Sequence, residues 1–199
     1  MIDMIMMTVL QAYPMYICAI PVILGGVMIR TRRRKKTGEK KIYLETLAFV
    51  LLCLSILLIL AATCYSNEFF ELFNLSNLSN LKEVHFDPSG FLQNILLISL
   101  AGSFHATINW VGNMVLFVPI GFFSMWISRI NTHIKMKIVI SCMIFSIVIE
   151  LTQLCYGRLA DVMDVVLNTT GGFIGCELFT YIMSLTENLK GRYKQVNKV

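Results

Sequence analysis

The feature that most limits the fold of this chain is a series of long apolar runs, of which residues 42–64 are the clearest. That run carries one charged side chain, Glu45, and a membrane-spanning helix needs about 20 consecutive apolar residues. The chain is 56% hydrophobic and 15% charged, whereas soluble domains are about 45–50% apolar and about 25% charged. The sequence therefore predicts an all-α, polytopic helical membrane bundle.

The apolar runs predict about five transmembrane helices and one interfacial helix. The interfacial helix is expected over residues 91–107, a segment that is apolar but short and that carries Gln93, Asn94 and His105. A segment of this kind can lie in the membrane surface with its polar side chains in the headgroup region. The five expected spans are residues 4–29, 42–64, 109–130, 137–156 and 162–185.

The basic residues predict how the chain is oriented. Cations collect in three hydrophilic segments, residues 30–41, 129–137 and 190–199, and short cytoplasmic loops carry an excess of Lys and Arg. All three segments fall on one side only if residues 91–107 do not cross. We therefore expect a plasma-membrane protein with its N-terminus outside and its C-terminus in the cytoplasm. The same clustering argues against a nucleic-acid partner, despite the net charge of +5.

These expectations divide the chain into four parts. Residues 1–64 form two helices joined by a basic cytoplasmic loop, and residues 65–108 form an extracytoplasmic loop with the interfacial segment. Residues 109–185 form a three-helix core, and residues 186–199 form a basic cytoplasmic tail.

The six cysteines lie in or at the ends of apolar runs and form no CxxC pair. That placement favours small apolar core residues over a zinc site or a disulfide framework. One bridge, between Cys64 and Cys155, stays open because both residues are expected near the outer surface. No metal and no cofactor are expected.

Polar side chains are predicted to converge at the outer ends of three spans. Residues three or four positions apart share one helix face, and several of these side chains have that spacing. A charged group at the centre of a membrane helix costs about 2.5–3.5 kcal/mol or more, so such groups normally face the bundle interior and pair. The candidate ligand-binding residues are Asn109, Asn113, Glu150, Gln153, Arg158, Asp161, Asp164 and Asn168.

The charges of this cluster do not balance in the sequence. Arg158 is the one cation near Glu150, Asp161 and Asp164, which are the candidates for acid–base catalysis. Two alternatives follow: one carboxyl group is protonated, or a cation or cationic ligand joins the site. A purely structural interpretation is also open, in which ion pairs join helix ends and Asp161 caps the last span.

Small residues mark a helix-packing face in the last span. Gly171 and Gly175 form a GxxxG pattern that Gly172 extends, and such a strip lets another helix approach closely. The pattern predicts a helix–helix partner. In the third span, Pro119 predicts a kink.

Two segments, NWVGNMVLFVPIGF and ELTQLCYGRLADVMDVVLNTTGGFIG, resemble the signature blocks of the VanZ-like family of bacterial membrane proteins. The resemblance covers roughly residues 109–175, with no departure at the charged positions. It implies a bacterial plasma-membrane protein of the cell envelope, and the family's namesake is associated with resistance to teicoplanin-type glycopeptide antibiotics. The matching positions are Asn113, Leu116, Phe117, Pro119, Gly121, Glu150, Gln153, Arg158, Asp161, Asp164, Asn168, Thr169, Gly171, Gly172 and Gly175.

Three classes of function are consistent with these features. The favoured one is a non-enzymatic factor at the outer leaflet, with membrane lipid and either a lipid-linked cell-wall precursor or a lipophilic glycopeptide as partners. The second is an enzyme acting on a lipid-linked phosphate or sugar, which the lack of an obvious nucleophile, phosphate loop or His-rich pattern disfavours. The third is a scaffold that packs against other envelope helices.

Overall fold

The computed structural model describes residues 13–36, 42–63, 104–128, 132–155 and 161–196, and within these ranges the chain is all-helical apart from short ends. The predicted all-α fold is therefore confirmed. The described helices are α2 (Tyr13–Lys36), α3 (Ile42–Thr63), α5 (Phe104–Ile127), α6 (Thr132–Cys155) and α7 (Val162–Val196).

Four of these helices contain a stretch long and apolar enough to cross a membrane: Met15–Arg32, Tyr43–Ala61, Trp110–Ile127 and Val162–Glu187. The protein thus has the helices of a multi-pass membrane protein. α6 has 24 residues but is not among these four, so its crossing stays a prediction. The expected interfacial helix falls largely outside the described residues, although residues 104–107 form the first turn of α5.

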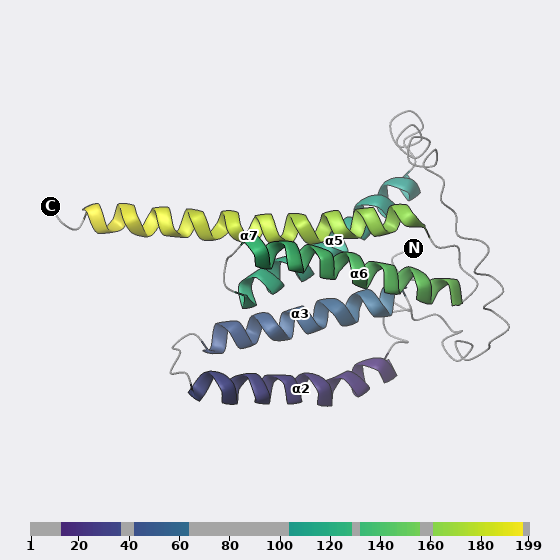
Figure 1. Ribbon diagram of the computed structural model, residues 1–199, viewed down its shortest axis with the longest axis horizontal. Helices are drawn as coiled ribbons and strands as arrows, with labels where there is room; N and C mark the ends of the chain where they lie inside the picture. The colour runs from purple at the N-terminus through teal and green to yellow at the C-terminus, as the bar shows by residue number, and fades with distance from the viewer. Residues whose placement is uncertain (1–12, 37–41, 64–103, 129–131, 156–160, 197–199) are drawn as a thin grey trace.

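Successive helices alternate in direction along the bundle (Figure 1). α2, α5 and α7 run one way, and α3 and α6 run the other way. The C-terminal ends of α2, α5 and α7 therefore lie at the same end of the bundle as the first residues of α3 and α6. We call this the basic end, because residues 30–36, Lys135, Lys137 and the last turns of α7 belong to it. The opposite end is called the polar end.

Two basic segments expected to lie beyond the spans are helical. The basic block that begins at Arg30 was expected to be a loop, but α2 continues through it to Lys36. The expected tail is likewise helical up to Val196. Lys and Arg are good helix formers, and they interact favourably with the negative end of the helix dipole. At 35 residues, α7 is about 52 Å long, longer than the roughly 30 Å hydrocarbon layer.

The closest packing in the described structure is the contact between α5 and α7. A methyl group added at Gly171 or Gly175 would overlap the main chain of α5, and one added at Gly121 would overlap the carbonyl oxygen of Gly172. The thiol of Cys176 donates to the carbonyl oxygen of Gly121, with 3.7 Å between the two atoms. The strip of small residues on α7 therefore receives α5 of the same chain. We call this contact the glycine seam.

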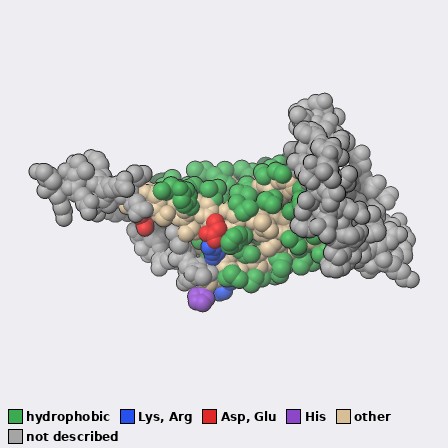
Figure 2. All heavy atoms as spheres, turned by 90° about the horizontal axis from the view of Figure 1, so that it is seen from above, with side chains coloured by type: hydrophobic (Ala, Val, Ile, Leu, Met, Phe, Trp, Pro, Cys, Tyr) green, Lys and Arg blue, Asp and Glu red, His purple; other side chains and the backbone are tan. Residues whose placement is uncertain are grey.

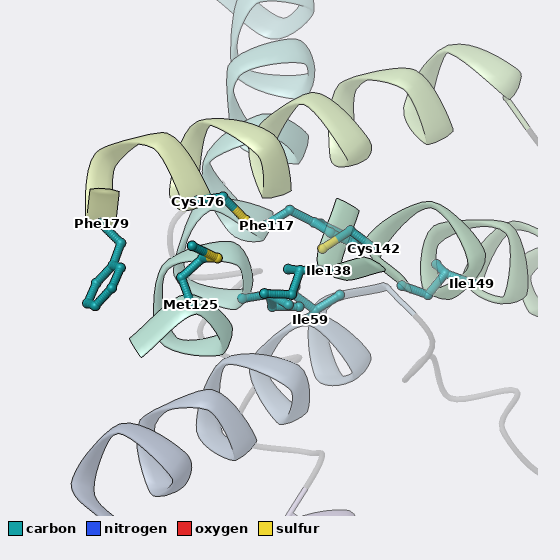
Figure 3. Packing of buried hydrophobic residues seen from close by; sticks show 9 residues of the cluster. Ile59, Phe117, Met125, Ile138, Cys142, Ile149, Cys176 and Phe179 are labelled. Atoms are coloured by element: carbon teal, nitrogen blue, oxygen red, sulfur yellow. The ribbon is translucent and has the colours of Figure 1, made fainter. Parts of the chain in front are cut away.

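The apolar core lies between α3, α5, α6 and α7 (Figure 3). Near the basic end, the ring of Phe122 meets that of Phe179 edge-to-face, with centroids 5.4 Å apart, an arrangement that aromatic pairs favour. Among the described side chains, Cys18, Cys53, Cys142 and Cys176 are free thiols; the bridge between Cys64 and Cys155 concerns side chains outside this part. The buried cluster comprises Ile59, Phe117, Ile120, Met125, Ile138, Cys142, Ile149, Cys176 and Phe179.

α2 lies at the edge of the bundle and packs mainly on α3 (Figure 1). None of its apolar stretch Met15–Arg32 is buried, as expected for a helix that faces lipid. It is joined to α3 near the basic end, where a guanidinium nitrogen of Arg30 lies 3.7 Å from a carboxylate oxygen of Glu45. The same guanidinium group lies 5.7 Å from the centre of the Phe49 ring.

We expect Gly175→Ala to destabilise the protein by about 1–3 kcal/mol, the usual cost of overpacking, because its methyl group would meet the main chain of α5. The measurement is reversible unfolding in mixed micelles. Gly112→Ala is the matched control, since a methyl group there meets nothing within 4 Å and alanine favours the helix. Equal stability of the two variants would contradict the glycine seam.

Candidate functional site

Side chains from α5 and α7 meet at the polar end. The carboxamide nitrogen of Asn113 donates to a carboxylate oxygen of Asp164, with 2.6 Å between the two atoms. The two residues are 51 positions apart in the chain, so this hydrogen bond joins two separate helices. Asp164 lies in the first turn of α7, where the positive end of the helix dipole also favours a negative charge.

α6 contributes Glu150, whose side chain is buried, with 6% of its surface exposed. One carboxylate oxygen of Glu150 accepts a hydrogen bond from the main-chain N–H of Asp161 at 2.9 Å. Asp161 in turn caps α7: its carboxylate accepts from the N–H of Met163 at 2.8 Å, and its carbonyl oxygen accepts from the N–H of Asp164 at 3.0 Å. The end of α6 and the beginning of α7 are thus joined through one buried carboxylate.

A second contact between α6 and α7 lies deeper in the bundle. The carboxamide nitrogen of Asn168 donates to the hydroxyl oxygen of Ser146 at 2.8 Å, and both side chains are buried. Ser146 was not among the predicted site residues, although it lies four positions before Glu150 and seven before Gln153, on the same helix face. Gln153 is also buried, with 7% of its surface exposed.

Each of the three predicted carboxylates accepts a hydrogen bond from a neutral donor. The donors are two main-chain N–H groups and the carboxamide of Asn113. Hydrogen bonds to a carboxylate are stronger than those between neutral groups, so these donors stabilise part of the negative charge. Arg158 lies outside the described residues, and Asn109 belongs to α5 but its side chain lies outside them. The pairing of Arg158 with a carboxylate stays a prediction.

An ion pair that the sequence pattern did not predict lies nearer the basic end. Glu177 lies within the apolar stretch Val162–Glu187 of α7, and its carboxylate forms an ion pair with the ammonium group of Lys135 on α6. That ammonium nitrogen also lies 5.5 Å from the centre of the Phe173 ring. Glu177 could have been identified from the sequence, because it is a carboxylate within an apolar run. Lys135 had been assigned to a loop, so its partner could not be identified.

Three polar contacts therefore follow the interface between α6 and α7 from one end to the other. They join Glu150 to the amide of Asp161, Ser146 to Asn168, and Lys135 to Glu177. Because each step back along α6 pairs with a step forward along α7, the two helices are antiparallel in register over residues 161–177. Figure 2 shows adjoining acidic and basic side chains on an otherwise largely hydrophobic surface.

Within the described ranges, no group of three or more His, Cys, Asp and Glu side chains is placed to hold a metal ion. What the polar end does offer is a set of carboxylate and amide groups, some buried and each in a defined position. Such a set can accept hydrogen bonds from hydroxyl or ammonium groups, because ionised carboxylates are acceptors only. The carboxyl groups could also exchange protons with a bound molecule.

Comparison with known proteins identifies the family. The sequence model of the VanZ/LLP1 family matches residues 42–184, which is more than half of the chain, and the protein therefore belongs to this family. The match begins at the first residue of α3, a helix in which the sequence analysis had found no signature, and leaves α2 outside. No curated protein and no solved structure matches the chain.

We expect Ser146→Ala and Asn168→Ala to be energetically coupled, because each removes one partner of the same buried hydrogen bond. In a double-mutant cycle, hydrogen bonds of this kind between membrane helices average about 0.6 kcal/mol and reach about 1.7 kcal/mol. Unfolding in mixed micelles measures the coupling. The control cycle pairs Ser146→Ala with Thr170→Ala, since the hydroxyl of Thr170 bonds within its own helix to Val166. Equal coupling in both cycles would contradict the contact.

Proposed function

We propose that this VanZ/LLP1 family protein is a non-enzymatic factor of the bacterial cell envelope that binds a lipid-linked cell-wall precursor or a lipophilic glycopeptide at the outer leaflet. The observation that carries the proposal is the convergence of polar side chains from α5, α6 and α7 at one end of the bundle. Ionisable groups in membrane helices are candidates for function by default, because burying them is costly.

The chemistry of the polar end fits these ligands. Asp161 and Asp164 lie in the first residues of α7, and Glu150 lies beside them at the end of α6. Their oxygens are acceptors, while cell-wall sugars and glycopeptides present hydroxyl and amino donors. A lipid tail or lipophilic substituent would lie along the apolar helix faces while the polar part reaches the carboxylates. This supports binding from within the membrane.

The proposed orientation follows from the two ends of the bundle. The basic end gathers residues 30–36, Lys135, Lys137 and the last turns of α7, and basic segments favour the cytoplasmic side. The polar end then faces outward, with the N-terminus outside and the C-terminus in the cytoplasm. The antiparallel register of α6 and α7 supports α6 as a crossing helix, because α6 accompanies a spanning stretch over residues 161–177.

An enzyme acting on a lipid-linked phosphate or sugar is the second candidate. The buried carboxylate of Glu150, held next to the start of α7, is the kind of group that acid–base catalysis uses. Turnover of a lipid pyrophosphate or a lipid-linked sugar by the purified protein, with or without magnesium, would favour this candidate. The scaffold hypothesis has less support, because the glycine seam is occupied by α5 of the same chain.

The carboxylates allow a test that separates a structural role from binding. Glu150→Gln keeps an oxygen that can accept from the N–H of Asp161, and Asp161→Asn keeps a good helix cap. Both changes remove charge and preserve the hydrogen bonds that join the helices. We expect near-normal unfolding curves. The affinity for a teicoplanin-type glycopeptide or for a lipid-linked precursor should fall about tenfold or more, since a hydrogen bond to a charged group contributes about 1.5–3 kcal/mol.

The same variants should change resistance in cells. A deletion strain carrying Glu150→Gln is expected to match the empty deletion strain in teicoplanin susceptibility, while the wild-type gene restores the parental level. Glu187→Gln is the control, because this exposed carboxylate lies on α7 near the basic end. Identical susceptibility of the parental, deletion and variant strains would argue against a role in resistance.

A further inference from the structure

A groove of about 350 Å³ lies between α3, α5 and α6, on the half of the bundle toward the basic end. It is half-open, and most of its walls are apolar. None of the residues of the polar end belongs to it. Its lining is formed by Leu52, Ile56, Ile120, Ser124, Ile127, Ser128, Ile138, Ser141, Cys142 and Phe145.

The position of the groove determines what surrounds it. Its walls on α3 and α5 belong to the stretches Tyr43–Ala61 and Trp110–Ile127, which are apolar enough to cross a membrane, so the groove opens toward lipid hydrocarbon. An empty groove would cost its lining atoms their dispersion contacts. A buried water needs two to four polar partners, which the apolar part of the lining, away from its three serines, does not offer. A hydrocarbon chain is the filling that this lining favours.

The size of the groove decides between a hydrocarbon chain and a protein helix. An α-helix with side chains is about 10 Å wide, so a half-open groove of about 350 Å³ does not enclose it. The volume is nevertheless within the range of about 300–1,000 Å³ that small-molecule sites occupy. A narrow, flexible acyl chain can enter the groove along its length, whereas a helix of a second copy could place only the side chains of one face in it.

The rim toward the basic end is polar and cationic. Ser124 lies in the last turn of α5, Ser128 directly follows that helix, and Ser141 lies across the groove on α6. The hydroxyl of Ser141 donates to the carbonyl oxygen of Lys137 at 2.8 Å. Lys137 is exposed and lies one turn nearer the basic end than Ser141. His133, also exposed, lies one further turn toward that end. The positive end of the α6 helix dipole adds to the positive potential at this rim.

We propose that the groove binds one acyl chain of an anionic phospholipid from the leaflet at the basic end. Its phosphate lies at Lys137 and the first turns of α6, and the serine hydroxyls lie at the level of the glycerol esters. The cationic rim selects for a headgroup with a net negative charge. A zwitterionic lipid could fill the groove but would gain less from Lys137, because its own ammonium group offsets the charge of its phosphate. This site is separate from the polar end and does not depend on the function proposed for it.

Native mass spectrometry of the full-length protein, incubated with phosphatidylglycerol or phosphatidylcholine in detergent, tests the proposal. The wild type should retain phosphatidylglycerol preferentially. Lys137→Gln should weaken phosphatidylglycerol retention about fivefold, because a basic residue near an anionic headgroup contributes roughly 1 kcal/mol. It should weaken phosphatidylcholine retention less, because that headgroup has no net charge. Arg32→Gln is the matched control, since it removes an exposed cation from α2, which does not line the groove, and should behave as the wild type.

A second pair of variants tests the groove itself. Ser124→Phe fills it from α5 and should reduce the retention of both lipids. Ile56→Trp fills it from α3, so the test stands even if one of the two variants does not fold. Equal losses in Lys137→Gln and Arg32→Gln, or normal retention in a folded variant with a filled groove, would overturn the proposal.

Discussion

The arrangement of this protein depends on the glycine seam between α5 and α7. Because Gly121, Gly171 and Gly175 carry no side chain, the two helices lie with their main chains in contact. This fixes their relative position, and with it the distance over which Asn113 can reach Asp164. α6 then packs against a neighbouring face of α7, where Cys142 lies close to Gly172. Small residues thus determine where the large polar ones meet.

The polar end illustrates how a membrane bundle accommodates several carboxylates. Each of the three carboxylates accepts a hydrogen bond from a neutral donor, and two of these donors are main-chain N–H groups at the beginning of a helix. Main-chain N–H groups at a helix N-terminus have no acceptor within the helix. A carboxylate beside them gives these donors an acceptor and gains a hydrogen-bond donor itself. The same contacts that stabilise the charges also hold their oxygens in place, which is what a binding site requires.

Much of this structure follows from the sequence, because apolar length and spacing are local properties. They predicted the all-α fold and the positions of the main helices, and topology alone indicated that Asn113, Glu150 and Asp164 would lie at one end. The contact of Ser146 with Asn168 and the ion pair of Lys135 with Glu177 were not predictable, because both depend on the register between two helices. The helical state of residues 30–36 was missed, since a basic segment has the same composition in a loop and in a helix.

The length of α7 has a mechanical consequence. It runs without interruption from the capped first turn at Asp161 to Val196, so no hinge separates the polar end from the residues beyond the hydrocarbon layer. A rigid rod converts a small rotation at one end into a larger displacement at the other. If the capped end is the pivot, a tilt of α7 moves Val196 roughly twice as far as it moves Glu177, in proportion to their distances along the helix. The C-terminal end of α7 is thereby a lever arm attached to the polar end.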